Sequence, residues 1–404
     1  LNFLPPSVGE NHREREFGKQ THKIILAIAI IMALFIGIYP YLPALNPSSL
    51  LVSVDVNFYF THMENSVNLD IFSFLSNIIQ QDRVLFLVFQ QVIVSLTGST
   101  DLAIRVIPAI LGVLLTISVY YFVSISSNDR YMAALAALFT ATSFQIVAGI
   151  NAGFYANWLA LIELNIFLAL FLKAIEHKRK ISRYSIVSTI LLVLILFTHS
   201  ATWIVVLGSL ITYAIITFTR RTLKLREAII IGQIILVNII TEIIKNNIFQ
   251  SQSTTQIAQS MTPQFSFSNL LQVFRTLNMT FTYFLGGAYA NPIAIILATI
   301  GLFLIAKKRQ NLYQILIAIT IVCSLGTFVT SSAFPEIFQS RFIYLVPFSV
   351  LAAIGFRAIL NAANNFFDNK AGAIGKAIPI MIQIIIFASL LSYALRIVGY
   401  VYTL

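Results

Sequence analysis

The residues most able to do chemistry lie in one polar loop, SVDVNFYFTHMENSVNLD (53–70). Asp55 comes shortly after a long apolar segment and between apolar neighbours, so its carboxylate is expected to be partly desolvated there. Desolvation raises a carboxyl pKa and makes the group a better proton acceptor. The alternative is that Asp55 caps a helix over 56–63. The same loop also offers possible second acids and a substrate contact: Glu64, Asp70 and Tyr59.

A divalent metal is an alternative in this loop, because His62 and Glu64 stand two residues apart and close to Asp55. The five histidines, however, form no HExxH motif, and the single cysteine forms no paired-Cys motif. We therefore assign no metal ligands and expect no obligatory cofactor.

Two arginines stand beside apolar segments. Arg83 opens QQDRVLFLVFQQ (80–91), and Arg341 opens RFIYLVPF within SRFIYLVPF (340–348). A guanidinium at a membrane interface can clamp a phosphate through paired hydrogen bonds. The alternative is that these side chains snorkel to the interface or set topology.

Three further polar residues fall in or next to apolar segments: Glu163, Glu242 and His199. Intramembrane acids are costly and point by default to function, although an interhelical hydrogen bond also explains them. His199, in FTHSATW (197–203), is expected in a tight hairpin, where it binds a sugar or phosphate oxygen or caps the turn.

The elements that must position these residues are membrane helices. The chain has 404 residues, 58% hydrophobic and only 10% charged, and its mean hydropathy is +0.86. A soluble domain has about 25% charged residues, so disorder, a disulfide scaffold and an ordinary soluble enzyme are excluded. The net charge of +11 is expected to set membrane orientation rather than to bind nucleic acid.

Eleven apolar runs are long enough to span a bilayer. They are 24–45, 102–125, 131–148, 154–173, 184–199, 201–218, 227–244, 288–306, 311–330, 342–360 and 377–400. The run 84–97 has 14 residues, which is typical of a re-entrant or interfacial helix. The prediction is an all-α polytopic membrane protein.

Charge favours leaving 84–97 out of the spans. With the N-terminus in the cytoplasm, 20 of the 26 Lys and Arg residues then fall on the inner side; counting 84–97 as a span lowers this to 17. The positive-inside rule therefore predicts a cytoplasmic N-terminus and an outer C-terminus.

This topology gives a cytoplasmic tail over 1–23 and a single transmembrane domain over 24–404. Two large outer loops, 46–101 and 245–287, carry most of the candidates. Trp158 and Trp203 fall near outer span ends, where interface aromatics are expected.

The order of these residues resembles the GT-C glycosyltransferases of the protein-mannosyltransferase and aminoarabinose-transferase kind. An Asp follows the first span, an Arg opens a short apolar helix, and LTGSTDLAIRVIPAILGVLLTISVYY (96–121) follows a family pattern. The matching positions are Gly98, Asp101, Ala103, Arg105, Pro108 and Gly112, and the resemblance covers about 24–360. It implies a GT-C-like bundle of about eleven spans, with short juxtamembrane helices in the first outer loop.

The resemblance also implies transfer of a sugar from a polyprenyl-phosphate-linked donor to an acceptor hydroxyl on the non-cytoplasmic face, with inversion. Asp55 would be the base, and Arg341, with Arg83 or Arg275, would bind the leaving phosphate. The implied partners are the donor lipid, a lipid, glycan or protein acceptor, and membrane lipids, but no nucleic acid. The setting that we expect is the plasma membrane of a prokaryote or archaeon rather than the endoplasmic reticulum.

Two alternatives remain. The family carries a second acid directly after the loop Asp, whereas Val56 follows Asp55 here, which suits a catalytically silent subunit of a larger complex. A transporter or flippase for a lipid-linked substrate would share the spans, although no repeat with matching broken helices is visible.

Overall fold

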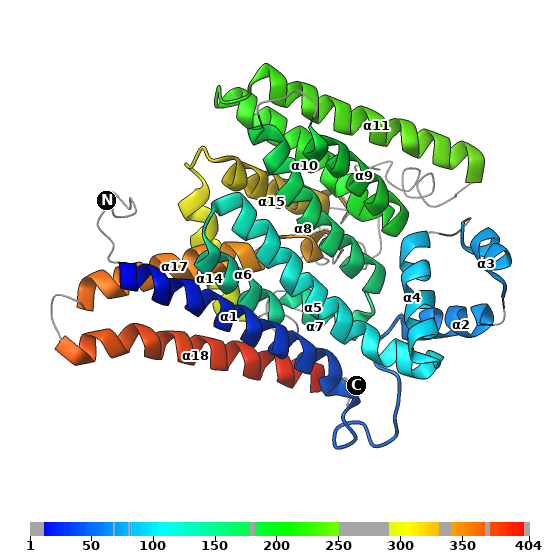
Figure 1. The fold of residues 1–404 in the computed structure, drawn as a ribbon, viewed down its shortest axis with the longest axis horizontal. Coiled ribbons are helices and arrows are strands. Elements are labelled where there is room, and N and C mark those ends of the chain that lie inside the picture. Colours follow the sequence, from blue (N-terminus) through cyan, green and yellow to red (C-terminus); the bar gives the residue numbers. More distant parts are fainter. Residues whose placement is uncertain are drawn as a thin grey trace, which may run out of the picture.

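The described part of the chain is helical. The computed structural model describes residues 12–249, 291–330 and 341–399, apart from 68, 80, 82, 178–181 and 368–371. Long helices run in roughly one direction and pack into a bundle (Figure 1). In the described residues no strand is present, so the prediction of an all-α polytopic membrane protein is confirmed.

The elements follow the predicted spans closely. In the first half they are α1 (His12–Ile38), a 3-10 turn (Tyr39–Tyr41), α2 (Val56–Ser66), α3 (Ile71–Ile78), α4 (Val84–Thr97), α5 (Thr100–Ser127), α6 (Arg130–Ala141) and α7 (Phe144–Ala152). Next come α8 (Tyr155–Glu176), α9 (Arg183–Thr198), α10 (Ser200–Thr219), α11 (Leu225–Phe249), α14 (Pro292–Ile305), α15 (Asn311–Thr330), α17 (Phe348–Phe367) and α18 (Gly372–Gly399).

Each predicted span overlaps a helix, but several bounds differ. Helix α1 begins inside the predicted tail, and α11 runs four residues beyond the point where the second outer loop was predicted to start. Among the described residues, seven segments are long and apolar enough to cross a membrane, and four more apolar helices are shorter. The count of eleven spans therefore stays a prediction.

The central span is broken into two helices. The apolar stretch within Arg130–Ala152 is entirely buried. Helix α6 ends just before Ser143, whose side chain caps α7 with a hydrogen bond. Helices α1, α5 and α17 pack against α6, and α8 packs against α5. Helices α1 and α18 run along one side of the bundle, and α11 runs along the opposite side (Figure 1).

Small residues let the helices approach closely. A β-carbon added at Gly301 would clash with the Leu351 carbonyl oxygen, and one added at Gly355 with the Leu297 carbonyl oxygen, so α14 and α17 touch through their backbones. Small residues at an interface are the usual device for packing helices in a membrane, where no hydrophobic force drives helices together.

The prediction that Trp158 and Trp203 are interface aromatics is wrong, because both rings are buried. A β-carbon on Gly149 would lie 2.6 Å from the Trp158 ring, and Trp203 Nε1 donates to Asn238 Oδ1 at 3.1 Å. Both tryptophans therefore fill the interior between helices.

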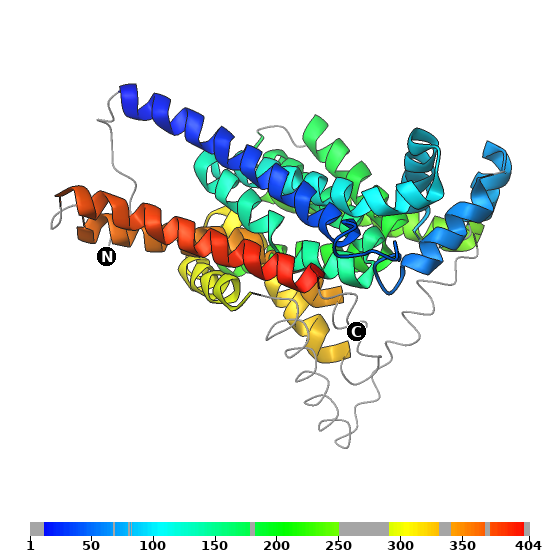
Figure 2. The ribbon, with the colours of Figure 1, turned by 90° about the horizontal axis from the view of Figure 1, so that it is seen from below.

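The short helices α2, α3 and α4 gather beyond one end of the long helices (Figure 2). This arrangement places the first loop over the ends of α7, α8 and α9, which is where the candidate site forms.

Candidate functional site

Asp55 stands where the first loop is fastened to the end of α7. The backbone N–H groups of Val54 and Asp55 donate to the carbonyls of Asn151 and Ala152, at 3.1 and 3.4 Å. Asp55 occupies the N-cap position of α2, but its side chain makes no capping hydrogen bond. The half-buried carboxylate accepts no hydrogen bond from any described residue, so it is available to a ligand.

Gly153 makes this close approach possible. It follows α7 with φ +72°, a left-handed conformation that glycine adopts without steric cost. A β-carbon there would lie 2.6 Å from Ser53 Oγ and 3.1 Å from Asp55 Cβ. The sequence carried a signal for this turn, since glycine is the usual residue just after a helix, but Gly153 was not predicted as part of the site.

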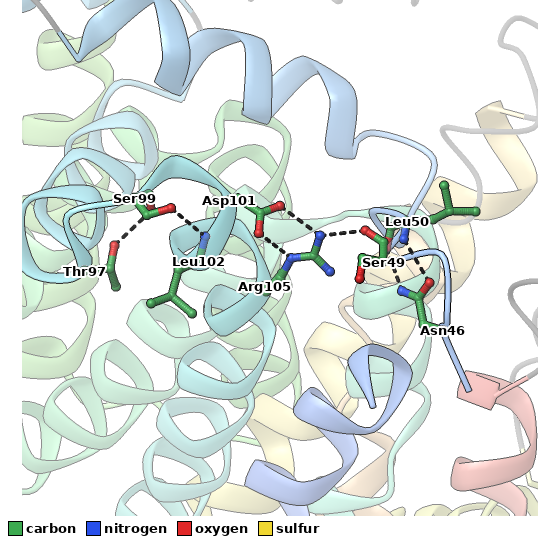
Figure 3. A network of polar contacts seen from close by, with 8 residues as sticks. All are labelled: Asn46, Ser49, Leu50, Thr97, Ser99, Asp101, Leu102 and Arg105. Atoms are coloured by element: carbon green, nitrogen blue, oxygen red, sulfur yellow. Dashed lines mark hydrogen bonds and ion pairs between the residues drawn. The ribbon is translucent and has the colours of Figure 1, made fainter. Parts of the chain in front are cut away.

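A second anchor holds the loop to α5 (Figure 3). Arg105 pairs with Asp101 through two hydrogen bonds of 2.8 Å, and its Nη2 also donates to the Ser49 carbonyl at 2.6 Å. Asn46 accepts from the Leu50 N–H and donates to the Leu50 carbonyl. Two members of the family-like pattern, Asp101 and Arg105, therefore fix the path of the loop that leads to Asp55.

Tyr59 and Arg83 form a pair one helical turn beyond Asp55. The Arg83 Nη1 donates to Tyr59 Oη at 2.8 Å, and the guanidinium lies 5.9 Å from the centroids of the Phe58 and Tyr59 rings. Burial raises the pKa of Tyr59 even though the Arg83 charge lowers it, so the phenol stays neutral. Arg83 itself has φ +75°, a conformation uncommon outside glycine, at the start of α4.

His199 is the single residue between α9 and α10. Its Nδ1 accepts from the Thr202 N–H at 3.2 Å and lies 2.9 Å from Thr202 Oγ1, so the predicted capping role is present. Burial lowers the pKa of His199, and the charges of Arg341 and Arg83 lower it further. The ring is thus neutral and, since Nδ1 is an acceptor, carries its proton on Nε2 as a hydrogen-bond donor.

Arg341 begins the described segment that leads into α17. Its guanidinium lies 5.7 Å from the centroid of the Phe154 ring. The segment after Arg341 is held by Tyr344, whose hydroxyl donates to the Gln145 carbonyl at 2.7 Å, while Gln145 Nε2 donates to the Val346 carbonyl at 2.8 Å. These bonds fix a short helical turn against α7.

These residues are linked to one another at one end of the bundle. Asp55 and Arg83 both act electrostatically on Tyr59, and Arg83 and Arg341 both act on His199. Arg83 also donates to Tyr59, Arg341 lies against the Phe154 ring, and Gly153 approaches Asp55. A carboxylate, two guanidinium groups and an imidazole N–H are therefore connected through shared neighbours. This donor set suits a phosphate, and the carboxylate suits a proton acceptor.

Glu163 supports the site from within the bundle. Its Oε1 accepts from Thr198 Oγ1 at 2.9 Å, directly before His199, and its buried Oε2 has no hydrogen-bond partner among the described residues. The structure thus ties Glu163 to the α9–α10 hairpin. Its predicted contact with substrate stays a prediction.

Other predicted residues stand apart from these linked residues. Glu64 is exposed on α2, nine residues from Asp55, or about 13 Å along a helix axis. Asp70 caps α3 by accepting from the N–H groups of Phe72 and Ser73, and the Ser73 bonds hold its pKa below the usual value. Neither is placed as a second acid beside Asp55. Arg275 lies outside the described residues.

Over the same described ranges, no group of three or more His, Cys, Asp or Glu side chains could hold a metal ion.

Comparison with known proteins agrees with this geometry. Residues 84–244 match the family model of dolichyl-phosphate-mannose-protein mannosyltransferases. The fold is similar to that of the archaeal oligosaccharyltransferase AglB from Archaeoglobus fulgidus in complex with an inhibitory peptide and a dolichol-phosphate, with a TM-score of 0.60 and 14% identity. That match covers 95% of this chain and 56% of the other.

A second structure of an Archaeoglobus fulgidus oligosaccharyltransferase, in complex with Zn and sulfate, gives a TM-score of 0.61 at 14% identity. It covers 93% of this chain and 53% of the other, so the chain spans about half the length of the enzymes whose fold it shares. Among curated proteins, no sequence matches significantly. The family model thus matches one segment of the chain, and over most of its length the chain shares the fold of these oligosaccharyltransferases.

Proposed function

We propose that the chain transfers a sugar from a polyprenyl-phosphate-linked donor to an acceptor hydroxyl on the non-cytoplasmic face of the membrane. The observation that carries this proposal is that Asp55 and Arg83 both act on Tyr59, while Arg83 and Arg341 both act on His199. The dolichol-phosphate bound by the structurally similar oligosaccharyltransferase supports a lipid-phosphate donor.

In this reaction the Asp55 carboxylate takes the proton of the acceptor hydroxyl. The acceptor oxygen attacks the anomeric carbon from the face opposite the phosphate, so the configuration inverts. The bond between that carbon and the phosphate oxygen breaks, and the lipid phosphate leaves with the bonding electrons. Arg83, Arg341 and the His199 Nε2–H stabilise the negative charge of the leaving phosphate. Because that leaving group is already stable, no metal is obligatory.

The acceptor remains a class rather than a molecule: a lipid, a glycan or a protein hydroxyl. The setting that we propose is a prokaryotic or archaeal plasma membrane, with the site on the outer side.

The test compares Asp55→Asn with Asp70→Asn in the purified full chain, using a radiolabelled polyprenyl-phosphate sugar and a mixture of acceptor hydroxyl compounds. Loss of a general base costs about 100-fold or more in rate, so Asp55→Asn should lose transfer. Asp70→Asn is the matched control, because asparagine caps a helix as well as aspartate. Wild-type turnover by Asp55→Asn would overturn the proposal.

One observation favours a second function, that of a catalytically silent subunit. Glu64 is exposed on α2, nine residues after Asp55, and the Asp70 carboxylate is engaged as the cap of α3. Such a subunit would still assemble with its partners after Asp55→Ala, and the wild-type chain would show no transfer of its own.

A further inference from the structure

The opposite end of α10 from His199 carries a cluster of cations that the transfer reaction does not use. The turn between α10 and α11 holds Arg220, Arg221 and Lys224, and the turn between α14 and α15 holds 307–309, which is Lys-Lys-Arg. Arg220 joins the two turns, because its Nη1 and Nη2 donate to the Lys308 and Ala306 carbonyls, each at 2.8 Å.

The five other cations form no ion pair within the described structure. Arg221, Lys224, Lys307, Lys308 and Arg309 are all exposed, and their side chains make no hydrogen bond or ion pair with described residues. The nearby acid Glu227 is buried and accepts from the Lys224 backbone N–H. Glu176, at the end of α8, acts electrostatically on Tyr213, as Glu227 does, and forms no ion pair with these cations in the described residues. Like charges held on joined turns repel one another, so an external anion would stabilise them.

Solvent-exposed or lipid-exposed apolar side chains border this cluster along the chain. Phe218, Leu225 and Phe303 are 72%, 79% and 76% exposed, and each stands within four residues of a cluster cation along the chain. Exposed aromatic and aliphatic groups next to unpaired cations match a molecule with an anionic head and a hydrocarbon tail.

We propose that this cluster binds the headgroup of an anionic phospholipid, with the acyl chains lying against Phe218, Leu225 and Phe303. The cations would contact the phosphate, and the predicted topology puts the site in the cytoplasmic leaflet. This site is independent of the proposed transfer reaction, since it lies at the other end of α10. A basic pocket between membrane helices is a recognised way to hold an acidic lipid.

The experiment uses the purified full chain in detergent with equal amounts of phosphatidylglycerol and phosphatidylcholine, and counts retained lipids by native mass spectrometry. The wild-type chain should retain phosphatidylglycerol preferentially. The triple variant Lys224→Gln, Lys307→Gln and Arg309→Gln should lose that preference by roughly tenfold.

The matched control removes three cations from the same predicted membrane side but another part of the bundle: Arg130→Gln, Lys173→Gln and Arg183→Gln. It should keep the wild-type preference. Equal loss in both triple variants would show a general charge effect and overturn the proposal. So would an unchanged preference in the cluster variant.

Two further measurements separate a lipid site from a site for soluble anions. The double variant Phe218→Ala and Phe303→Ala leaves every charge in place and should still weaken lipid retention. Complete displacement of phosphatidylglycerol by inorganic phosphate would show a site for soluble anions and would also overturn the proposal.

Discussion

His199 combines two roles that one substitution can separate. Its Nδ1 caps α10 through the Thr202 N–H, and its Nε2–H is the group that we assign to the donor phosphate. In His199→Asn the side-chain oxygen should still accept the hydrogen bond from the Thr202 N–H, whereas the Nε2–H donor is lost. Because a hydrogen bond to a charged group is worth about 1.5–3 kcal/mol, we expect transfer to fall by about 10- to 100-fold at nearly unchanged thermal stability.

The comparison with His199→Ala completes this prediction. Alanine removes the cap as well, which costs about 1 kcal/mol of stability. Thermal unfolding and transfer rates are measured on both variants. If His199→Asn transfers sugar at the wild-type rate, the histidine is only a cap and contributes nothing to phosphate binding.

The environment of His199 also predicts how stability depends on pH. Burial and the charges of Arg341 and Arg83 lower its pKa in the folded chain, whereas the unfolded residue titrates at about 6.5. Below that pH the unfolded state binds more protons than the folded state. The free energy of unfolding is therefore undiminished by His199 above pH 6.5 and decreases as the solution is acidified below it. The half-buried His62, whose pKa is also lowered, adds a change in the same direction.

The measurement is the thermal midpoint of the wild-type chain and of His199→Asn between pH 7.5 and 5.5. The wild-type midpoint should decrease, with at most about 1.4 kcal/mol of stability lost per pH unit from this residue. The variant should decrease less. Parallel curves for the two proteins would show that His199 is not the group responsible.

At the scale of elements, the turn from α7 to α8 decides where Asp55 stands. Gly153→Ala puts an alanine in the left-handed backbone conformation. It also brings the new β-carbon against Ser53 Oγ and Asp55 Cβ. We expect a loss of about 1–3 kcal/mol of stability from the backbone alone, with a further loss of transfer because the Asp55 loop must move. Both are measured on the purified chain.

Gly98→Ala is the matched control for that turn. Gly98 has φ +68° after α4, but no atom lies within 4 Å of the added β-carbon. It should show a similar backbone cost and keep its transfer activity. Equal activities for the two variants would mean that the contact between Gly153 and Asp55 does not set the geometry of the base.

The elements were predictable in a way that the site was not. Long apolar runs locate helices directly, and the predicted short helix 84–97 has the same bounds as α4. Which face of such a helix points inward is not encoded by an all-round apolar sequence, and this is why Trp158 and Trp203 were misplaced. Asp55, Arg83, His199 and Arg341 were identified singly, and only the tertiary structure links them, through Tyr59 and through the charges that act on His199.

For the whole molecule, the remaining question is which end faces the cytoplasm. The positive-inside rule puts the α10–α11 and α14–α15 turns inside and the Asp55 loop outside. Cys323 is fully buried, so single cysteines can be introduced against a silent background. Thr61→Cys and Gln310→Cys are suitable, since both residues are exposed and neither belongs to the candidate site or the cation cluster.

In intact cells a membrane-impermeant maleimide should label Thr61→Cys and leave Gln310→Cys unlabelled until the membrane is opened. The unsubstituted chain, which carries only Cys323, is the control and should stay unlabelled throughout. This pattern would put Asp55 on the side where nucleotide sugars are absent and a lipid-linked donor is required. The reverse pattern would place Asp55 in the cytoplasm and would remove the reason for a polyprenyl-phosphate donor.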